Sequence, residues 1–169
     1  MAGMSPEGGR GDPVSGGGLA ELLRRGGFFY EVPGATPQDV LGWLVSAVKL
    51  PGHVDREKLL SAVLEREDLL STAVGNGIAL PHPRNPIIEK EEDQCAVLGF
   101  LENEVDWDAL DGKTVTAVVL VVSSSARSHL TALQRITFFC RDGGFCGLLK
   151  RRAPPEEILA YIEKAEAAW

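Results

Sequence analysis

Long apolar runs and paired cysteines are both missing from this chain of 169 residues. Its longest apolar run, Ala117 to Val122, is far too short to cross a bilayer. The first residues contain no apolar core of the kind that a signal peptide needs. Three cysteines, Cys95, Cys140 and Cys146, form no CxxC pair and cannot all pair internally, which favours a reducing compartment. We therefore expect a cytoplasmic protein without membrane insertion.

Basic residues are also scarce, since 17 Lys and Arg face 24 Asp and Glu for a net charge of −7. A nucleic-acid surface requires clustered Lys and Arg, so we expect no nucleic-acid partner. The chain contains no P-loop, no HExxH and no dense Cys/His cluster, so it predicts no metal and no other cofactor. The spacing of Asp106, Asp108 and Asp111 does not fit an EF-hand and indicates a solvated turn.

The apolar and helical patterns of the sequence predict one α/β domain. Residues 1–18 are rich in glycine and have little to bury, so we expect a disordered leader followed by a domain over residues 19–169. Apolar and β-branched runs predict strands at 28–32, 77–81, 95–101 and 115–122. Helical spacing predicts helices that begin after Thr36, after Asp55, in the serine-rich segment that follows the last strand, near residue 144 and at residue 155. The expected fold is a mixed sheet of about four or five strands with helices on both faces.

One stretch, residues 71–84, concentrates unusual residues in the sequence STAVGNGIALPHPR. Two glycines flank Asn76 and permit a positive φ, and two prolines flank His82 and interrupt regular strand pairing. The imidazole should therefore stand on a stiff segment at the end of a strand. By spacing alone, a lone histidine in such a turn is usually a solvated loop residue, and Arg66 upstream would be a surface residue on a helix.

These residues resemble the active-site signature of the enzyme IIA domains of the phosphotransferase system. The similarity is to the fructose/mannitol class, which includes the nitrogen-regulatory IIA proteins, and it extends in pattern from about Gly26 to the C-terminus. Leu70 and Pro83 occupy positions where glycine is common in the family. The matching segments are Arg66-Glu67, Ser71-Thr72 and the run Gly75-Asn76-Gly77-Ile78-Ala79-Leu80-Pro81-His82.

The resemblance implies that His82 accepts a phosphoryl group from the phosphocarrier HPr or an HPr paralogue. Arg66 would brace the phosphoryl oxygens or the loop that carries the imidazole. His129, which opens a helix after the serine-rich segment, matches a second family histidine that lies beside the first. By pattern alone it could be a packing residue. The resemblance implies that it bonds the phosphoryl group, holds the tautomer of His82 and lies within one phosphate's width of it.

Further donors for the phosphoryl group are expected from Ser71, Thr72 and Asn76, and Pro83 and Arg84 are expected to form a rim where partner proteins dock. The downstream partner would be a IIB domain or a regulatory target.

Two alternatives remain open. In one, the protein is a purely regulatory module that binds sensor kinases or potassium transporters. In the other, it is a hydrolase with His82 or His129 as base and Ser71 or a serine of residues 123–125 as nucleophile, although no nucleophile-elbow pattern is present.

Overall fold

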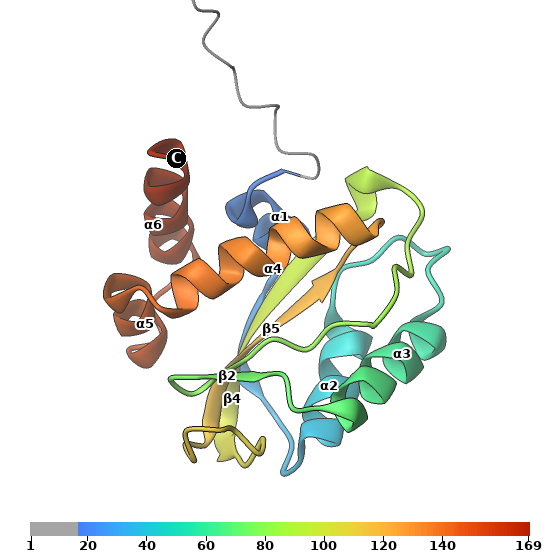
Figure 1. Ribbon diagram of the computed structural model, residues 1–169, viewed down its shortest axis with the longest axis horizontal. Helices are drawn as coiled ribbons and strands as arrows, with labels where there is room; N and C mark the ends of the chain where they lie inside the picture. The colour runs from blue at the N-terminus through green and yellow to red at the C-terminus, as the bar shows by residue number, and fades with distance from the viewer. Residues whose placement is uncertain (1–16) are drawn as a thin grey trace, which may run out of the picture.

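A five-stranded mixed sheet separates two layers of helices (Figure 1). The computed structural model describes residues 17–169, so the predicted leader lies outside the described residues except for its last two. The strand order is β1-β4-β5-β3-β2, which confirms the predicted fold class. The strands are β1 (Phe28–Val32), β2 (Ala73–Gly75), β3 (Ile78–Ala79), β4 (Cys95–Val105) and β5 (Val115–Val122).

The central strand β5 is the best predicted element. Its residues are largely β-branched, and every one except Thr116 is buried. It pairs antiparallel with β4 and parallel with β3, while β1 adds parallel to β4 and β2 adds antiparallel to β3. The parallel β3–β5 pair is the feature that later positions the candidate site.

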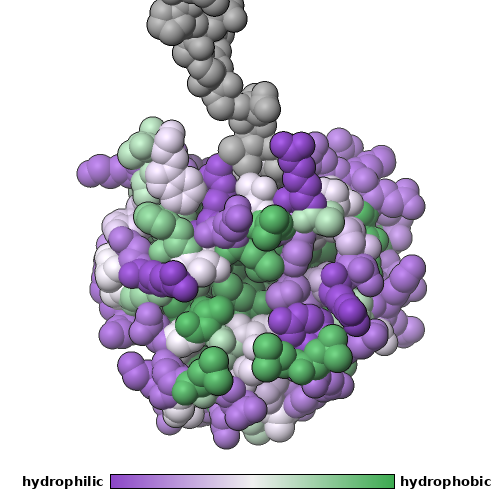
Figure 2. Space-filling view, viewed as in Figure 1, coloured by the Kyte–Doolittle hydropathy of each residue, from purple (hydrophilic) through white to green (hydrophobic). Residues whose placement is uncertain are grey.

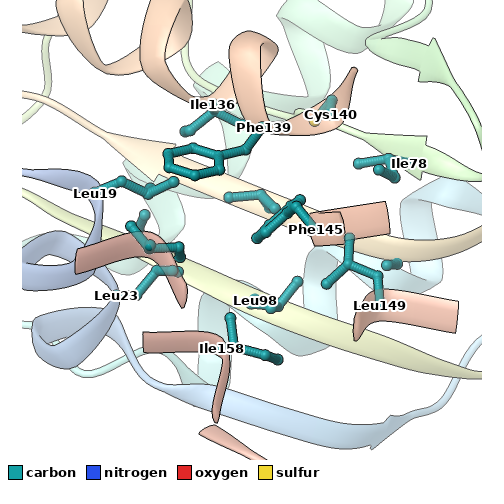
Figure 3. Close-up of a cluster of buried hydrophobic side chains, with 14 of the residues drawn as sticks. Leu19, Leu23, Ile78, Leu98, Ile136, Phe139, Cys140, Phe145, Leu149 and Ile158 are labelled. Carbon is teal, nitrogen blue, oxygen red and sulfur yellow. The ribbon is translucent and has the colours of Figure 1, made fainter. Parts of the chain in front are cut away.

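Helices cover both faces of the sheet, as expected. One face carries α1 (Leu19–Gly26), α4 (Ala126–Cys140), α5 (Gly143–Lys150) and α6 (Pro155–Ala167). Phe139 and Phe145 fill the core on this side, and Ile158 from α6 packs with them (Figure 3). The other face carries α2 (Pro37–Ala47) and α3 (Arg56–Leu69), and a short 3₁₀ turn (Glu91–Asp93) precedes β4. Within residues 17–169, no helix combines the length and the apolarity that a membrane span requires.

Three helices begin where their capping residues predict. The Thr36 hydroxyl accepts the Asp39 N–H at the start of α2, and the Asp55 carboxylate accepts the Lys58 N–H at the start of α3. The Ser125 hydroxyl accepts the Ser128 N–H at 3.1 Å and so caps α4, the helix that carries His129.

Four elements differ from the predictions. Residues 19–26 form a helix that was not among the predicted ones, and β4 continues four residues beyond 101. The strand expected at 77–81 is only two residues long, because Gly77 has φ +76° and Pro81 cannot donate to the ladder. Strand β2 was not predicted, since three residues are too few to show alternation.

Candidate functional site

The parallel pairing of β3 and β5 brings the two predicted histidines to one edge of the sheet. Beyond β3 the chain stays beside β5, because the Val121 N–H donates to the Pro81 carbonyl at 3.1 Å, one residue before His82. Strand β5 then ends and leads into α4, where His129 closes the first turn through a bond from its N–H to the Ser125 carbonyl. The carboxyl ends of neighbouring parallel strands thus deliver both side chains to the same place.

The ring centroids of His82 and His129 lie 4.8 Å apart, with 49° between the ring planes. The predicted proximity of the two imidazoles is therefore confirmed. His82 Nδ1 lies 2.8 Å from the Leu80 carbonyl oxygen. A carbonyl oxygen can only accept, so Nδ1 carries the hydrogen and Nε2 of the neutral ring holds the lone pair. The backbone of Leu80 thus holds the tautomer, a role that was expected from His129; that expectation was wrong.

Both imidazoles are neutral at pH 7. Burial is the main cause that lowers the pKa of His82, and the charge of Arg66 lowers it further, while the Leu80 bond and Glu67 oppose the shift. Burial also lowers the pKa of His129, together with His82 and Arg66, to about 4. A neutral imidazole is the form that can act as a nucleophile.

Arg66 lies in the last turn of α3, where its Nη1 donates to the Leu70 carbonyl at 2.7 Å. Its positive charge lowers the pKa of both His82 and His129. A guanidinium carries five N–H donors, and the bond to Leu70 occupies one nitrogen. The guanidinium therefore keeps N–H donors that the Leu70 bond does not use.

Glu67, the neighbour of Arg66, accepts several hydrogen bonds, although the sequence alone predicted no role for it. Its carboxylate accepts the Thr72 N–H at 3.0 Å, the Thr72 hydroxyl at 2.6 Å and the Trp107 indole N–H at 2.8 Å. These bonds tie the end of α3 to the approach of β2 and to the loop after β4. Trp107 is buried.

Ser71 and Thr72 are held inside this scaffold. The Ser71 hydroxyl donates to the Trp107 carbonyl, and the Thr72 hydroxyl, which is buried, donates to Glu67. Each hydroxyl hydrogen therefore already has a protein acceptor. In this structure the two residues, which were expected to bind phosphate, bond within the loop that carries the site.

Asn76, expected to bind phosphate, makes its side-chain contact away from the two imidazoles. Asn76 is exposed at the β2–β3 turn with φ +56°, and its Nδ2 donates to the Cys140 carbonyl at 3.2 Å. Cys140 ends α4, whereas His129 lies in its first turn, and the rise of an α-helix separates them by about 16 Å. Asn76 instead joins the hairpin to the far end of α4.

The two residues that were expected to form a docking rim, Pro83 and Arg84, are not both exposed. Pro83 is buried and Arg84 is exposed, and both line a small hollow beside His129. The exposed apolar side chains near the site are Leu69 and Leu70 at the end of α3 and Leu130 next to His129, with 61%, 69% and 58% of their surfaces exposed. Figure 2 shows apolar side chains gathered in the middle of the face on which α4 lies, surrounded by polar residues. His53 lies outside the site, with its Nε2 3.6 Å from a carboxylate oxygen of Asp93.

Fold and site together define a mixed α/β protein with two neutral imidazoles and a guanidinium at one sheet edge. The family described as "Phosphoenolpyruvate-dependent sugar phosphotransferase system, EIIA 2" matches residues 21–165. The chain belongs to this family.

Relatives and solved structures agree with this assignment. A nitrogen regulatory protein of Pseudomonas aeruginosa is 34% identical over 148 residues, which cover 85% of this chain and 93% of the relative. The nitrogen regulatory protein IIA-Ntr from Neisseria meningitidis has the same fold, with a TM-score of 0.72 at 20% identity over 85% of this chain and 98% of that chain. The enzyme IIA-mannitol of Escherichia coli, solved with phosphorylated enzyme IIB-mannitol, has a TM-score of 0.60 at 20% identity over 79% and 93% of the two chains. Family and relatives support a role in the phosphotransferase system, as a phosphocarrier or as a regulator.

Proposed function

We propose that this protein carries a phosphoryl group on Nε2 of His82. The observation that supports this most directly is the bond from His82 Nδ1 to the Leu80 carbonyl. It directs the lone pair to Nε2, in a ring whose lowered pKa keeps it unprotonated at pH 7. The nucleophile is thus prepared without a general base.

In the proposed step, the Nε2 lone pair attacks the phosphorus of a phosphohistidine on HPr or an HPr-like carrier. The phosphorus–nitrogen bond of the carrier breaks, and its electron pair returns to the carrier's ring nitrogen. Such transfers pass through a loose in-line transition state, so the protein contributes position and charge. Arg66 and the N–H of His129 would meet the phosphoryl oxygens, and the Leu80 carbonyl would stabilise the positive charge that develops on the His82 ring.

The partners proposed are HPr or an HPr-like protein upstream and a IIB domain or a regulatory target downstream, all in the cytoplasm. The exposed side chains of Leu69, Leu70 and Leu130 provide apolar surface on which they would dock in turn. No cofactor takes part. The Pseudomonas relative is a nitrogen regulatory protein, and this name favours the hypothesis that the phosphoryl group acts as a regulatory signal.

The hydrolase alternative is disfavoured by the serine contacts. A serine nucleophile needs a hydrogen bond to its base. Among residues 17–169, the Ser71 hydroxyl donates to Trp107 and the Ser125 hydroxyl pairs with that of Ser128. Neither contacts an imidazole.

The test is incubation of the protein with ³²P-labelled phosphoenolpyruvate, enzyme I and HPr. We expect an acid-labile, alkali-stable label that disappears in His82→Ala and persists in His53→Ala, the matched change at an exposed histidine. Circular dichroism would verify that both variants are folded. Nitrogen-15 NMR of the phosphorylated ring should assign the phosphorus to Nε2. Absence of label in the wild type, or label retained in His82→Ala, would contradict the proposal.

A further inference from the structure

A small hollow adjoins the two imidazoles without including His82 or Arg66. Its volume is about 110 Å³, and its polar wall consists of Arg84, Asn85, Ser123 and His129, with Ala126 at the start of α4. On this measure one water molecule needs about 10–15 Å³, so the hollow accommodates a ligand of several heavy atoms.

Ser123 points to a ligand in this hollow. The residue is only 4% exposed, yet its hydroxyl makes no hydrogen bond with any residue of the described part of the chain. Nor is its oxygen sealed off, because no fully enclosed side-chain oxygen or nitrogen in residues 17–169 lacks a partner. Ser123 lines the hollow, and its hydroxyl oxygen keeps contact with solvent. Buried hydroxyls are normally hydrogen-bonded, so a partner supplied from outside would satisfy it.

The charge around the hollow is uniformly suited to an anion. Helix α4 is 15 residues long, and its first N–H groups, those of Ala126 and Arg127, have no acceptor within the described residues. Such groups and the helix dipole attract anions. Arg84 forms no ion pair with any residue from 17 to 169, and no carboxylate lines the hollow.

We propose that this hollow binds a small oxyanion, either inorganic phosphate or a short carboxylate. The Ser123 hydroxyl, the Arg84 guanidinium and the first amides of α4 are its donors. The site is separate from the phosphoryl position on His82. Binding of the oxyanion does not depend on the function proposed above, whereas its effect on phosphorylation rests on that function. His129 forms a wall of the hollow and also faces His82, so the two sites share one imidazole.

Sharing His129 has a functional consequence. An anion in the hollow would repel a phosphoryl dianion on His82, and both would compete for the single N–H of His129. Binding of the oxyanion should therefore weaken phosphorylation, and phosphorylation should weaken binding of the oxyanion by the same factor. The hollow would let the concentration of a small anion set the phosphorylated fraction.

The experiment is a titration of the full chain at constant ionic strength, followed by ¹H–¹⁵N NMR, with sodium phosphate in one arm and sodium acetate in the other. We expect saturable shifts at the amides of Ser123, Ala126 and Arg127, equally in wild type and in His82→Ala. Saturation by phosphate alone identifies a tetrahedral oxyanion, and saturation by acetate alone identifies a carboxylate. If neither anion saturates, or if His82→Ala abolishes the shifts, the proposal is wrong.

Two arginine variants sharpen the test. Arg84→Gln should weaken binding about tenfold, since one charge-assisted bond is lost. Arg141→Gln removes the same charge from an exposed side chain at the far end of α4, which does not line the hollow, and should change the affinity less than about twofold. Ser123→Ala should weaken binding about threefold or more. Equal effects of the two arginine changes would show attraction to net charge alone and would overturn the proposed site.

Discussion

The Glu67 carboxylate accepts the indole N–H of Trp107 at 2.8 Å, across 40 positions of sequence. The same carboxylate accepts two hydrogen bonds from Thr72. These bonds fix the last turn of α3, and Arg66 is the preceding residue of that turn. Glu67 therefore fixes the turn of α3 that carries Arg66.

Glu67→Gln should destabilise the protein and slow its phosphorylation. Glutamine has one acceptor oxygen and an NH₂ group that would face a donor, so at least one of the three bonds is lost. We expect the free energy of unfolding to fall by about 1–3 kcal/mol, measured by urea denaturation with Trp fluorescence. The matched control is Glu65→Gln, an exposed position on the same helix, which should change stability by less than about 0.5 kcal/mol. Similar losses in both variants would remove the special role of Glu67.

His129→Ala should slow transfer from phosphorylated HPr to His82 without preventing it. The variant keeps the nucleophile and its tautomer, because the Leu80 bond is untouched. It loses one charge-assisted bond to the phosphoryl group, worth about 1.5–3 kcal/mol, so the rate should fall about 10- to 150-fold. Rapid-quench measurements of phosphoryl transfer test this, and His129→Gln should recover part of the rate because its amide still donates. An unchanged rate in His129→Ala would contradict the proposed contact.

Local sequence signals suffice for most of the fold. The β-branched run of β5 and the caps at Thr36, Asp55 and Ser125 each specify their element without help from distant residues. Strand β2 could not be predicted from such signals, because its three residues show no pattern of their own. Hydrogen bonds with β3 hold them in the extended conformation.

The site depends on information that local patterns do not contain. The sequences of the two strands do not specify that β3 pairs parallel with β5. This pairing brings His82 and His129 together. Only the family resemblance led to that pair. The same limit explains Asn76, whose place in the signature suggested a phosphate contact although the hairpin turns it toward Cys140.

Glu166→Gln should loosen the attachment of α1. Glu166 of α6 accepts the N–H groups of Leu19 and Ala20 at 3.0 and 3.1 Å and pairs with Arg135 of α4, so it caps a helix whose own N-cap, Gly18, has no side chain. The bonds are largely shielded from water, and we expect the free energy of unfolding to fall by about 1–3 kcal/mol in urea titrations.

The control for this change is Glu163→Gln, on the same helix. Glu163 pairs with Arg24, but both side chains are about half exposed, so the change should cost about 0–1 kcal/mol. If Glu163→Gln were as destabilising as Glu166→Gln, the capping role would be refuted.

The stability of the protein should fall in acid, and His129 should account for part of the fall. Its pKa is lowered from 6.5 to about 4 in the folded state. Between pH 6.5 and about 4, the unfolded chain therefore binds a proton at His129 that the folded protein does not bind. The stabilisation linked to neutral His129 is therefore complete above pH 6.5 and is lost as the pH falls toward about 4. His82, whose pKa is also lowered, adds to the same slope. Urea midpoints at about pH 7, 5.5 and 4.5 should decrease in wild type and in His53→Gln, and decrease less in His129→Gln, which has no proton to take up. A His129→Gln protein with the full wild-type slope would mean that burial of this imidazole does not oppose its protonation.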